Sequence, residues 1–247
     1  MRRFLFRTFA AALWLTLATS LSVPALAHDA GAPWKIIALG DSITMMGYPA
    51  RLWQKLTQAH LGTFEFIGSM KANAPGLGGF SGSIEAHNGY NVTNLLKPSG
   101  PEGLGGNNAF NDSRDLHAWF DNASPDILLM HIGSTSGYGG RPQVSLVLLS
   151  YSAILRAVRA SNPKVIIVIA QLIPLAVKSA DVRPINNAIP GWAKANSTAD
   201  SPIIVVDMYT GFDSEAETAD GIHPNVAGSQ WMADKWFDAL SPVIRNH

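Results

Sequence analysis

The chain has 247 residues, 47% of them hydrophobic, and its 18 basic and 18 acidic side chains cancel to a formal net charge of zero. Balanced charge without a lysine or arginine block argues against a nucleic-acid partner, because such partners are held by neutralising phosphates. The absence of cysteine excludes disulfides, a thiol nucleophile and thiolate metal sites.

The first 27 residues have the pattern of an export signal. Three arginines precede an apolar stretch at residues 9–21, and Ala25-Leu26-Ala27 supplies the small residues that a signal peptidase reads. This stretch of 13 residues is shorter than the ~20 needed to span a bilayer. We therefore expect a signal peptide over residues 1–27, export to the periplasm or the extracellular space, and no membrane span after cleavage.

Residues 28–247 are predicted to form a single domain, which we expect to be a monomer. Short runs rich in Ile, Val and Leu predict five strands, at residues 34–39, 64–67, 126–132, 164–170 and 202–206. Helical patterns predict helices at residues 48–60, 144–160, 181–195 and 226–240. Continuous apolar strands that alternate with helices are typical of an α/β fold in which helices cover both faces of a parallel sheet.

The segment at residues 72–111 interrupts this alternation. It is rich in glycine and asparagine and contains Pro75, Pro98 and Pro101. Long irregular loops are uncommon in compact domains and are often functional, although a mobile surface loop would have the same composition. We treat this insertion as a candidate wall of a substrate site.

Two short motifs at opposite ends of the domain carry the residue types of an activated serine. Gly40-Asp41-Ser42 follows the first predicted strand, and Asp220-Gly221-Ile222-His223-Pro224 precedes the last predicted helix. A serine hydroxyl becomes an effective nucleophile when a histidine takes its proton and a carboxylate holds that histidine. The motifs predict Ser42 as nucleophile, His223 as general base and Asp220 as the group that orients the imidazole.

Other acidic and histidine side chains have simpler interpretations. Asp41 and Asp207 stand at predicted strand ends, where hydrogen bonds within a turn or helix cap are the expected role. His131 lies within an apolar run and is expected to be a hydrogen-bonded core residue, and His87 and His117 are too scattered to form a metal site with it. We predict no metal and no cofactor.

These motifs resemble the blocks of the GDSL/SGNH hydrolase superfamily. The first motif continues as Ile43-Thr44, and Glu85-Ala86-His87-Asn88-Gly89-Tyr90 resembles the second block of the family. The layout is similar to the acetylxylan-esterase-like branch, carbohydrate esterase family 3. The resemblance implies a three-layer α/β/α, flavodoxin-like fold with a five-stranded parallel sheet, and a serine esterase. It also implies an oxyanion hole built from the backbone N–H groups of Ser42 and Gly89.

The third block departs from the family. Relatives read Gly-x-Asn-Asp after the strand at 126–132 and use the Asn amide as a third oxyanion donor, whereas this chain reads Gly133-Ser134-Thr135-Ser136. Loss of one such donor typically slows acyl transfer ~10²- to 10³-fold. Three interpretations stay open: a hydrolase in which Thr135, Asn107 or Asn108 completes the hole, a protein that only binds, and an acyltransferase. The complete Ser, His and Asp set favours the hydrolase.

The resemblance and the predicted export together favour removal of O-acetyl or another short acyl group from an extracellular or cell-envelope polysaccharide. Lipid esters are the second candidate. The insertion at residues 72–111 is rich in glycine and asparagine, which suits hydrogen bonds to sugar hydroxyls better than an acyl-chain groove. The expected reaction is attack by Ser42 on the ester carbonyl, followed by hydrolysis of the acyl-enzyme.

Overall fold

The computed structural model describes residues 28, 31–72, 77–93, 120, 123–137, 142–177 and 180–246. The strands are β1 (Trp34–Gly40), β2 (Phe64–Ile67), β3 (Met70–Lys71), β4 (Ser83–Ala86), β5 (Ile127–His131), β6 (Ile166–Ala170) and β7 (Ile203–Val206). The helices are α1 (Tyr48–Gln58), α3 (Val144–Ser161), α4 (Arg183–Asn196) and α5 (Val226–Arg245), with short 3-10 helices η1 (Thr44–Met46) and η3 (Ser134–Gly137).

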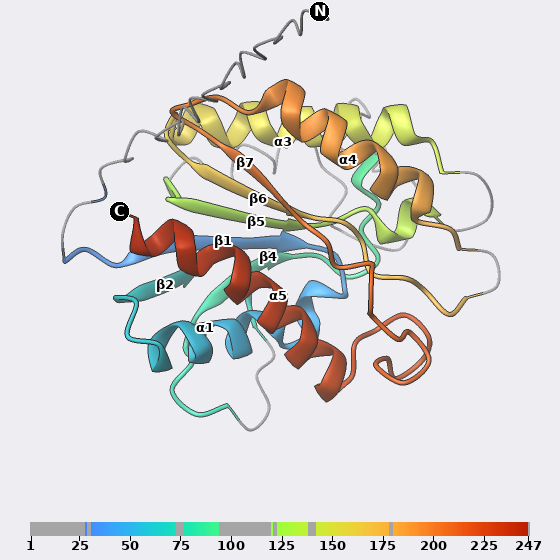
Figure 1. Ribbon diagram of the computed structural model, residues 1–247, viewed down its shortest axis with the longest axis horizontal. Coiled ribbons are helices and arrows are strands. Elements are labelled where there is room, and N and C mark those ends of the chain that lie inside the picture. Colours follow the sequence, from blue (N-terminus) through green and yellow to red (C-terminus); the bar gives the residue numbers. More distant parts are fainter. Residues whose placement is uncertain are drawn as a thin grey trace, which may run out of the picture.

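The strands form one sheet in the order β3-β4-β1-β5-β6-β7, and β2 pairs with the first half of β1. All of these pairs are parallel except β3 with β4. Helices α1 and α5 cover one face and helices α3 and α4 cover the other (Figure 1). The described residues therefore have the predicted three-layer α/β/α architecture.

The predicted strand count of five needs correction. All five predicted strands are present, but among the described residues the sheet has seven strands because β3 and β4 are added at one side. Strand β4 lies within the segment at 72–111 that we interpreted as irregular. It has Glu85 between Ile84 and Ala86, so it shows no apolar run, and its position is set by pairing with the end of β1. Residues 73–76 and 94–111 of that segment, and the predicted signal peptide, lie outside the described residues.

Alternate residues of the central strands face opposite helical layers. In β5, Leu128 and Met130 pack in the core under α3 and α4, whereas Ile127 and Leu129 pack in the core under α1 and α5. These four side chains are at most 1% exposed. A strand buried on both faces has no polar alternation, which is why the continuous apolar runs predicted β1, β5 and β6 well.

Helix α3 is apolar enough, with a mean hydropathy of 1.3 over its 18 residues, to cross a membrane by length and composition. Its inner face packs on the sheet through Val147, Ile154 and Val158. On the same face the hydroxyl of Tyr151 donates a 2.7 Å hydrogen bond to the carbonyl oxygen of Ile132. These contacts are those of a core helix in an α/β domain.

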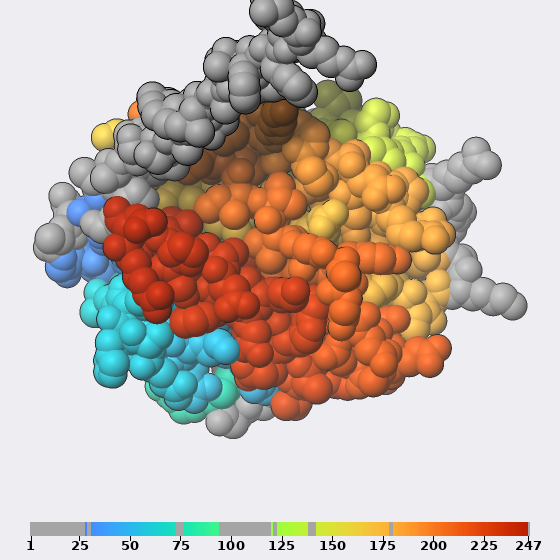
Figure 2. Space-filling view, viewed as in Figure 1, coloured from blue at the N-terminus to red at the C-terminus, as the bar shows by residue number. Residues whose placement is uncertain are grey.

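On the opposite face, α5 lies beside α1 and the loop that follows β7 continues along the surface next to it (Figure 2). The side chain of Lys55 on α1 forms an ion pair with Asp234 on α5. Asn225 caps the start of α5 by accepting hydrogen bonds from the N–H groups of Ala227 and Gly228. The cap fixes where the loop after β7 ends and the helix begins.

Three chain segments meet at the carboxyl edge of the sheet. Gly40, the last residue of β1, is level with Ala86 on β4 and with His131 on β5. The turns that follow these three strands therefore emerge side by side. This edge is where open α/β sheets place their ligand sites.

Candidate active site

Ser42 lies in a tight turn directly after β1. A Cβ atom on Gly40 would come within 1.8 Å of Thr44 Oγ1 and 2.7 Å of the carbonyl oxygen of His131, so only glycine fits before the turn. The carboxylate of Asp41 accepts a 3.0 Å hydrogen bond from the N–H of Ile43, which closes the turn. Ser42 is thus held at the end of a buried strand.

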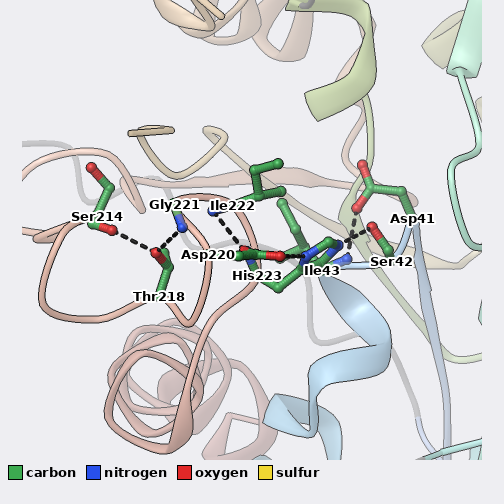
Figure 3. Close-up of polar contacts among 9 residues, drawn as sticks. All are labelled: Asp41, Ser42, Ile43, Ser214, Thr218, Asp220, Gly221, Ile222 and His223. Carbon is green, nitrogen blue, oxygen red and sulfur yellow. Dashed lines mark hydrogen bonds and ion pairs between the residues drawn. The ribbon is translucent and has the colours of Figure 1, made fainter. Parts of the chain in front are cut away.

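Asp220 and His223 lie in the loop between β7 and α5. One carboxylate oxygen of Asp220 accepts hydrogen bonds from the N–H groups of Ile222 at 3.0 Å and His223 at 2.7 Å. Gly221 has a φ of 83°, a left-handed conformation that glycine adopts without strain. The hydroxyl of Thr218 accepts a hydrogen bond from the N–H of Gly221, and this bond holds the loop beside Asp220 (Figure 3).

The structure brings Ser42, His223 and Asp220 into one line (Figure 3). His223 Nδ1 donates a 2.6 Å hydrogen bond to Asp220 Oδ2, and His223 Nε2 lies 2.9 Å from Ser42 Oγ. The hydrogen bond to the carboxylate keeps the imidazole proton on Nδ1. Nε2 therefore carries a lone pair, which accepts a hydrogen bond from the serine hydroxyl. This is the arrangement in which an imidazole can remove the hydroxyl proton.

The backbone N–H of His223, with its ring and the N–H of Ile222, lowers the pKa of the Asp220 carboxyl below its ordinary value. A lowered pKa keeps this carboxyl ionised at neutral pH. Asp220 can therefore orient and stabilise a protonated His223 without taking its proton.

Gly89 lies in the turn that follows β4, at the same edge of the sheet. Its φ of 68° is left-handed, and the turn is closed by a 3.2 Å hydrogen bond from the N–H of Tyr90 to the carbonyl oxygen of His87. The N–H of His87 donates to the carbonyl oxygen of Gly40 at 3.1 Å. Among the described residues, neither the N–H of Ser42 nor the N–H of Gly89 donates a hydrogen bond.

The structure gives Thr135 a different partner from the one expected. Its hydroxyl donates a 2.8 Å hydrogen bond to the carbonyl oxygen of Tyr90. A threonine hydroxyl carries a single hydrogen, so in this arrangement Thr135 has none to offer an oxyanion. Ser136 likewise donates to the side-chain oxygen of Asn91 at 2.8 Å. Thr135 and Ser136 thus tie η3 to the turn that contains Gly89. Asn107 and Asn108 lie outside the described residues.

Asp41 is fully buried beside Ser42. Burial raises the pKa of its carboxyl to about 6, although the N–H of Ile43 and the neighbouring Ser134 oppose that rise. Asp207 accepts hydrogen bonds from the N–H groups of Tyr209 and Thr210, so it closes a turn at the end of β7. Both aspartates therefore have the turn-forming hydrogen bonds predicted for them.

His131 is a core residue, as its sequence position predicted. It is fully buried, and its Nε2 accepts a 3.3 Å hydrogen bond from the N–H of Ile173. Burial lowers the pKa of this imidazole to about 4, so it is neutral at physiological pH. In the part of the chain that the structure describes, no cluster of three or more His, Asp or Glu side chains could hold a metal ion, and His117 lies outside that part.

Sequence reasoning assigned no role to the pair formed by Glu85 and His87. Both side chains are buried, at 1% and 5% exposure, and Glu85 Oε1 lies 2.7 Å from His87 Nε2. The available signal was a glutamate two residues before a histidine in a short segment that leads into the predicted oxyanion turn. Buried polar side chains are usually hydrogen-bonded, and these two residues are hydrogen-bonded to each other.

Comparison with known proteins finds similar sequences and similar folds. A model of the GDSL-like lipase/acylhydrolase family matches residues 38–231. A carbohydrate esterase family 3 structure from Talaromyces cellulolyticus is 29% identical, covering 87% of this chain and 99% of that one, with a TM-score of 0.73. An acetyl esterase mutant with an acetate ion is 28% identical, covering 86% of this chain and 99% of that one, with a TM-score of 0.71.

A curated relative is also similar. The multidomain esterase of Ruminococcus flavefaciens is 28% identical over 252 aligned positions, which cover 93% of this chain. The match covers 31% of that relative, so the chain spans about a third of its length. The similarity therefore concerns one part of a larger protein.

Proposed function

The chain belongs to the GDSL-like lipase/acylhydrolase family, and on that premise we propose that it is a carboxylic ester hydrolase that removes short acyl groups, with O-acetyl first, from a polysaccharide. The observation that carries the proposal is the line from Asp220 through His223 to Ser42, with contacts of 2.6 and 2.9 Å. Such a line activates a serine for attack on a carbonyl carbon.

The proposed reaction has two halves. Ser42 Oγ attacks the ester carbonyl carbon while His223 Nε2 takes the hydroxyl proton, and the carbonyl oxygen becomes an oxyanion held by the N–H groups of Ser42 and Gly89. The intermediate collapses when the sugar oxygen leaves with the proton from His223, which gives an acyl-enzyme. Water then loses a proton to His223 and attacks the acyl carbon. This second intermediate collapses when Ser42 Oγ leaves with the proton from His223, which releases the carboxylic acid and restores the Ser42 hydroxyl.

The proposed oxyanion hole has two donors, because the hydroxyl of Thr135 is bonded to the carbonyl oxygen of Tyr90. A missing donor typically costs ~10²- to 10³-fold in rate, which is far less than loss of the whole triad. We therefore propose a slower or re-tuned hydrolase. In it Thr135 supports the turn that carries Gly89 and does not contact the oxyanion.

The polysaccharide substrate is supported by two observations. The similar structures include a carbohydrate esterase and an acetyl esterase with an acetate ion. In addition, the loop between β7 and α5 that carries Asp220 and His223 forms an open surface depression of about 520 Å³, whose lining includes Tyr209, Asp213 and Glu215. Polar side chains around an open depression can form hydrogen bonds with sugar hydroxyls. Action in the periplasm or outside the cell, as a monomer, is part of the same proposal.

Hydrolysis of p-nitrophenyl acetate and of acetylated xylan by the parent chain and by Ser42→Ala tests the proposal. We expect acetate release by the parent and its loss in Ser42→Ala, while Ser81→Ala, at an exposed serine outside the triad, behaves as the parent. Glycan binding without turnover in the parent would support a binding protein instead. Acyl transfer to an added alcohol in preference to water would support an acyltransferase, and turnover of long-chain lipid esters alone would support a lipid esterase.

A further inference from the structure

We propose that Glu85 is a positioning residue of the oxyanion hole, and that it acts by holding His87 and thereby the turn that presents the N–H of Gly89. This inference rests on the function proposed above. It concerns a buried hydrogen-bonded pair next to the site that takes no part in the proton transfers between Ser42, His223 and Asp220.

Glu85 has an unusually complete set of hydrogen-bond donors for a buried carboxylate. Its side chain is 1% exposed, and its oxygens accept from the N–H of Ser69 at 2.9 Å, from the hydroxyl of Ser69 at 2.8 Å and from Nε2 of His87 at 2.7 Å. An unpaired buried carboxylate would be costly, so these three bonds fix the side chain in one position. Glu85 thereby joins the segment between β2 and β3 to the end of β4.

The backbone of His87 connects the Glu85 side chain to the site through two hydrogen bonds. Its N–H donates to the carbonyl oxygen of Gly40, the residue two before the nucleophile, and its carbonyl oxygen accepts from the N–H of Tyr90 across the turn. Gly89 lies inside that turn with its left-handed φ of 68°. Because Glu85 fixes the imidazole while the backbone of His87 forms the start of the turn, a shift of Glu85 would shift the Gly89 N–H relative to Ser42.

The turn is held from its other side by neutral groups. Thr135 donates to the carbonyl oxygen of Tyr90, and Ser136 donates to the side chain of Asn91. Glu85 and His87 supply the buried half of the support. A hole with two donors depends strongly on their alignment, since a misplacement of about 1 Å can cost ~10²-fold in rate.

The test compares Glu85→Gln with Glu65→Gln, the same change at an exposed glutamate on the neighbouring strand β2. Glutamine keeps the size of the side chain but replaces one acceptor oxygen with a donor, so the three bonds cannot all persist. For p-nitrophenyl acetate we expect kcat to fall about 10- to 100-fold in Glu85→Gln, with KM changed less than about 3-fold. We also expect the ¹⁵N–¹H resonance of Gly89 to move in Glu85→Gln and to stay in place in Glu65→Gln.

Ser69→Ala is a milder second variant, because it removes only the hydroxyl donor at an exposed position. It should lower kcat by about 2- to 5-fold, so the proposal stays testable if Glu85→Gln fails to fold. The proposal is overturned if the folded variants keep kcat within twofold of Glu65→Gln, if the loss falls on KM alone, or if the Gly89 resonance stays in place. Absence of Ser42-dependent turnover in the parent would instead contradict the proposed function, and the Gly89 resonance would still decide the positioning role.

Discussion

The hydroxyl of Thr135 donates a 2.8 Å hydrogen bond to the carbonyl oxygen of Tyr90, one residue beyond Gly89. The resemblance places an oxyanion donor at position 135. In this chain the hydroxyl at that position is instead bonded to the turn that contains Gly89. The bond links the loop after β5 to the loop after β4, and both loops lie at the edge that holds Ser42. The catalytic consequences of the altered third block follow from this relationship.

Thr135→Asn should raise kcat for p-nitrophenyl acetate. An asparagine amide has two hydrogens, so one can reach the oxyanion, and a third donor is typically worth ~10²-fold or more at full alignment. We expect about a 10-fold gain because the bond to the carbonyl oxygen of Tyr90 is disturbed at the same time. Thr135→Ser keeps the hydroxyl and is the matched control, with kcat near that of the parent. An unchanged or lower kcat in Thr135→Asn would show that the hole has been rebuilt around the threonine.

Asp220→Asn should reduce kcat by about 10²- to 10⁴-fold with little change in folding. The variant keeps the shape of the side chain but loses the charge that stabilises protonated His223 and fixes its tautomer. Asp213→Asn, in the same loop but without a contact to His223, is the control and should retain most activity on p-nitrophenyl acetate, which has no sugar ring to occupy the depression. Steady-state kinetics at neutral pH measure both. Comparable losses in the two variants would mean that the loop as a whole matters and not the carboxylate of Asp220.

Asp41→Asn should stabilise the protein increasingly as the pH rises. The pKa of Asp41 is raised from 3.8 in the unfolded chain to about 6 by burial, so between these values the folded state binds more protons than the unfolded state. The free energy of unfolding of the parent therefore falls as the pH rises from 3.8 to about 6, by roughly 3 kcal/mol in total. Asparagine removes this cost.

Urea unfolding of the parent and of Asp41→Asn from pH 4 to pH 7.5 checks this expectation. The difference in unfolding free energy should grow in favour of Asp41→Asn up to about pH 6 and then level off. Asp200→Asn, at an exposed position, is the control for loss of a carboxyl at the surface. A difference between Asp41→Asn and the parent that does not change with pH would contradict the raised pKa.

Gly40→Ala should destabilise the fold by about 2 to 4 kcal/mol. The added methyl group would lie 1.8 Å from Thr44 Oγ1 and 2.7 Å from the backbone oxygen of His131, and the backbone contact cannot relax by a side-chain rotation. Gly191→Ala is the matched control, because a Cβ atom there meets nothing within 4 Å and the site is inside α4. It should be neutral or slightly stabilising. Equal thermal midpoints for the two variants would contradict the tight turn.

The sequence predicted the parts of the fold that rest on local composition. Strands β1, β5 and β6 are continuous apolar runs because helices cover both of their faces. Strand β4 escaped prediction because Glu85 lies inside it, and that residue is explained only by partners that the fold brings to it, among them Ser69. A pattern of residues along one segment cannot show such a partner.

The same distinction applies to the site. Ser42, Asp220 and His223 belong to short motifs that can be recognised in the sequence. They could therefore be identified although Ser42 and His223 are 181 positions apart in the chain. The acceptor of the Thr135 hydroxyl lies 45 positions away in another loop and was not predictable from either motif. The raised pKa of Asp41 likewise arises from burial, which depends on the packing of the whole edge.

Labelling with a fluorophosphonate probe, followed by peptide mass spectrometry, tests the central claim most directly, because the probe reacts with a serine only when a base activates its hydroxyl. The account predicts a single adduct on Ser42 that is lost in Ser42→Ala, strongly reduced in His223→Ala and preserved in Ser81→Ala. Absence of an adduct on Ser42 in the folded parent, or labelling that is indifferent to His223→Ala, would contradict it.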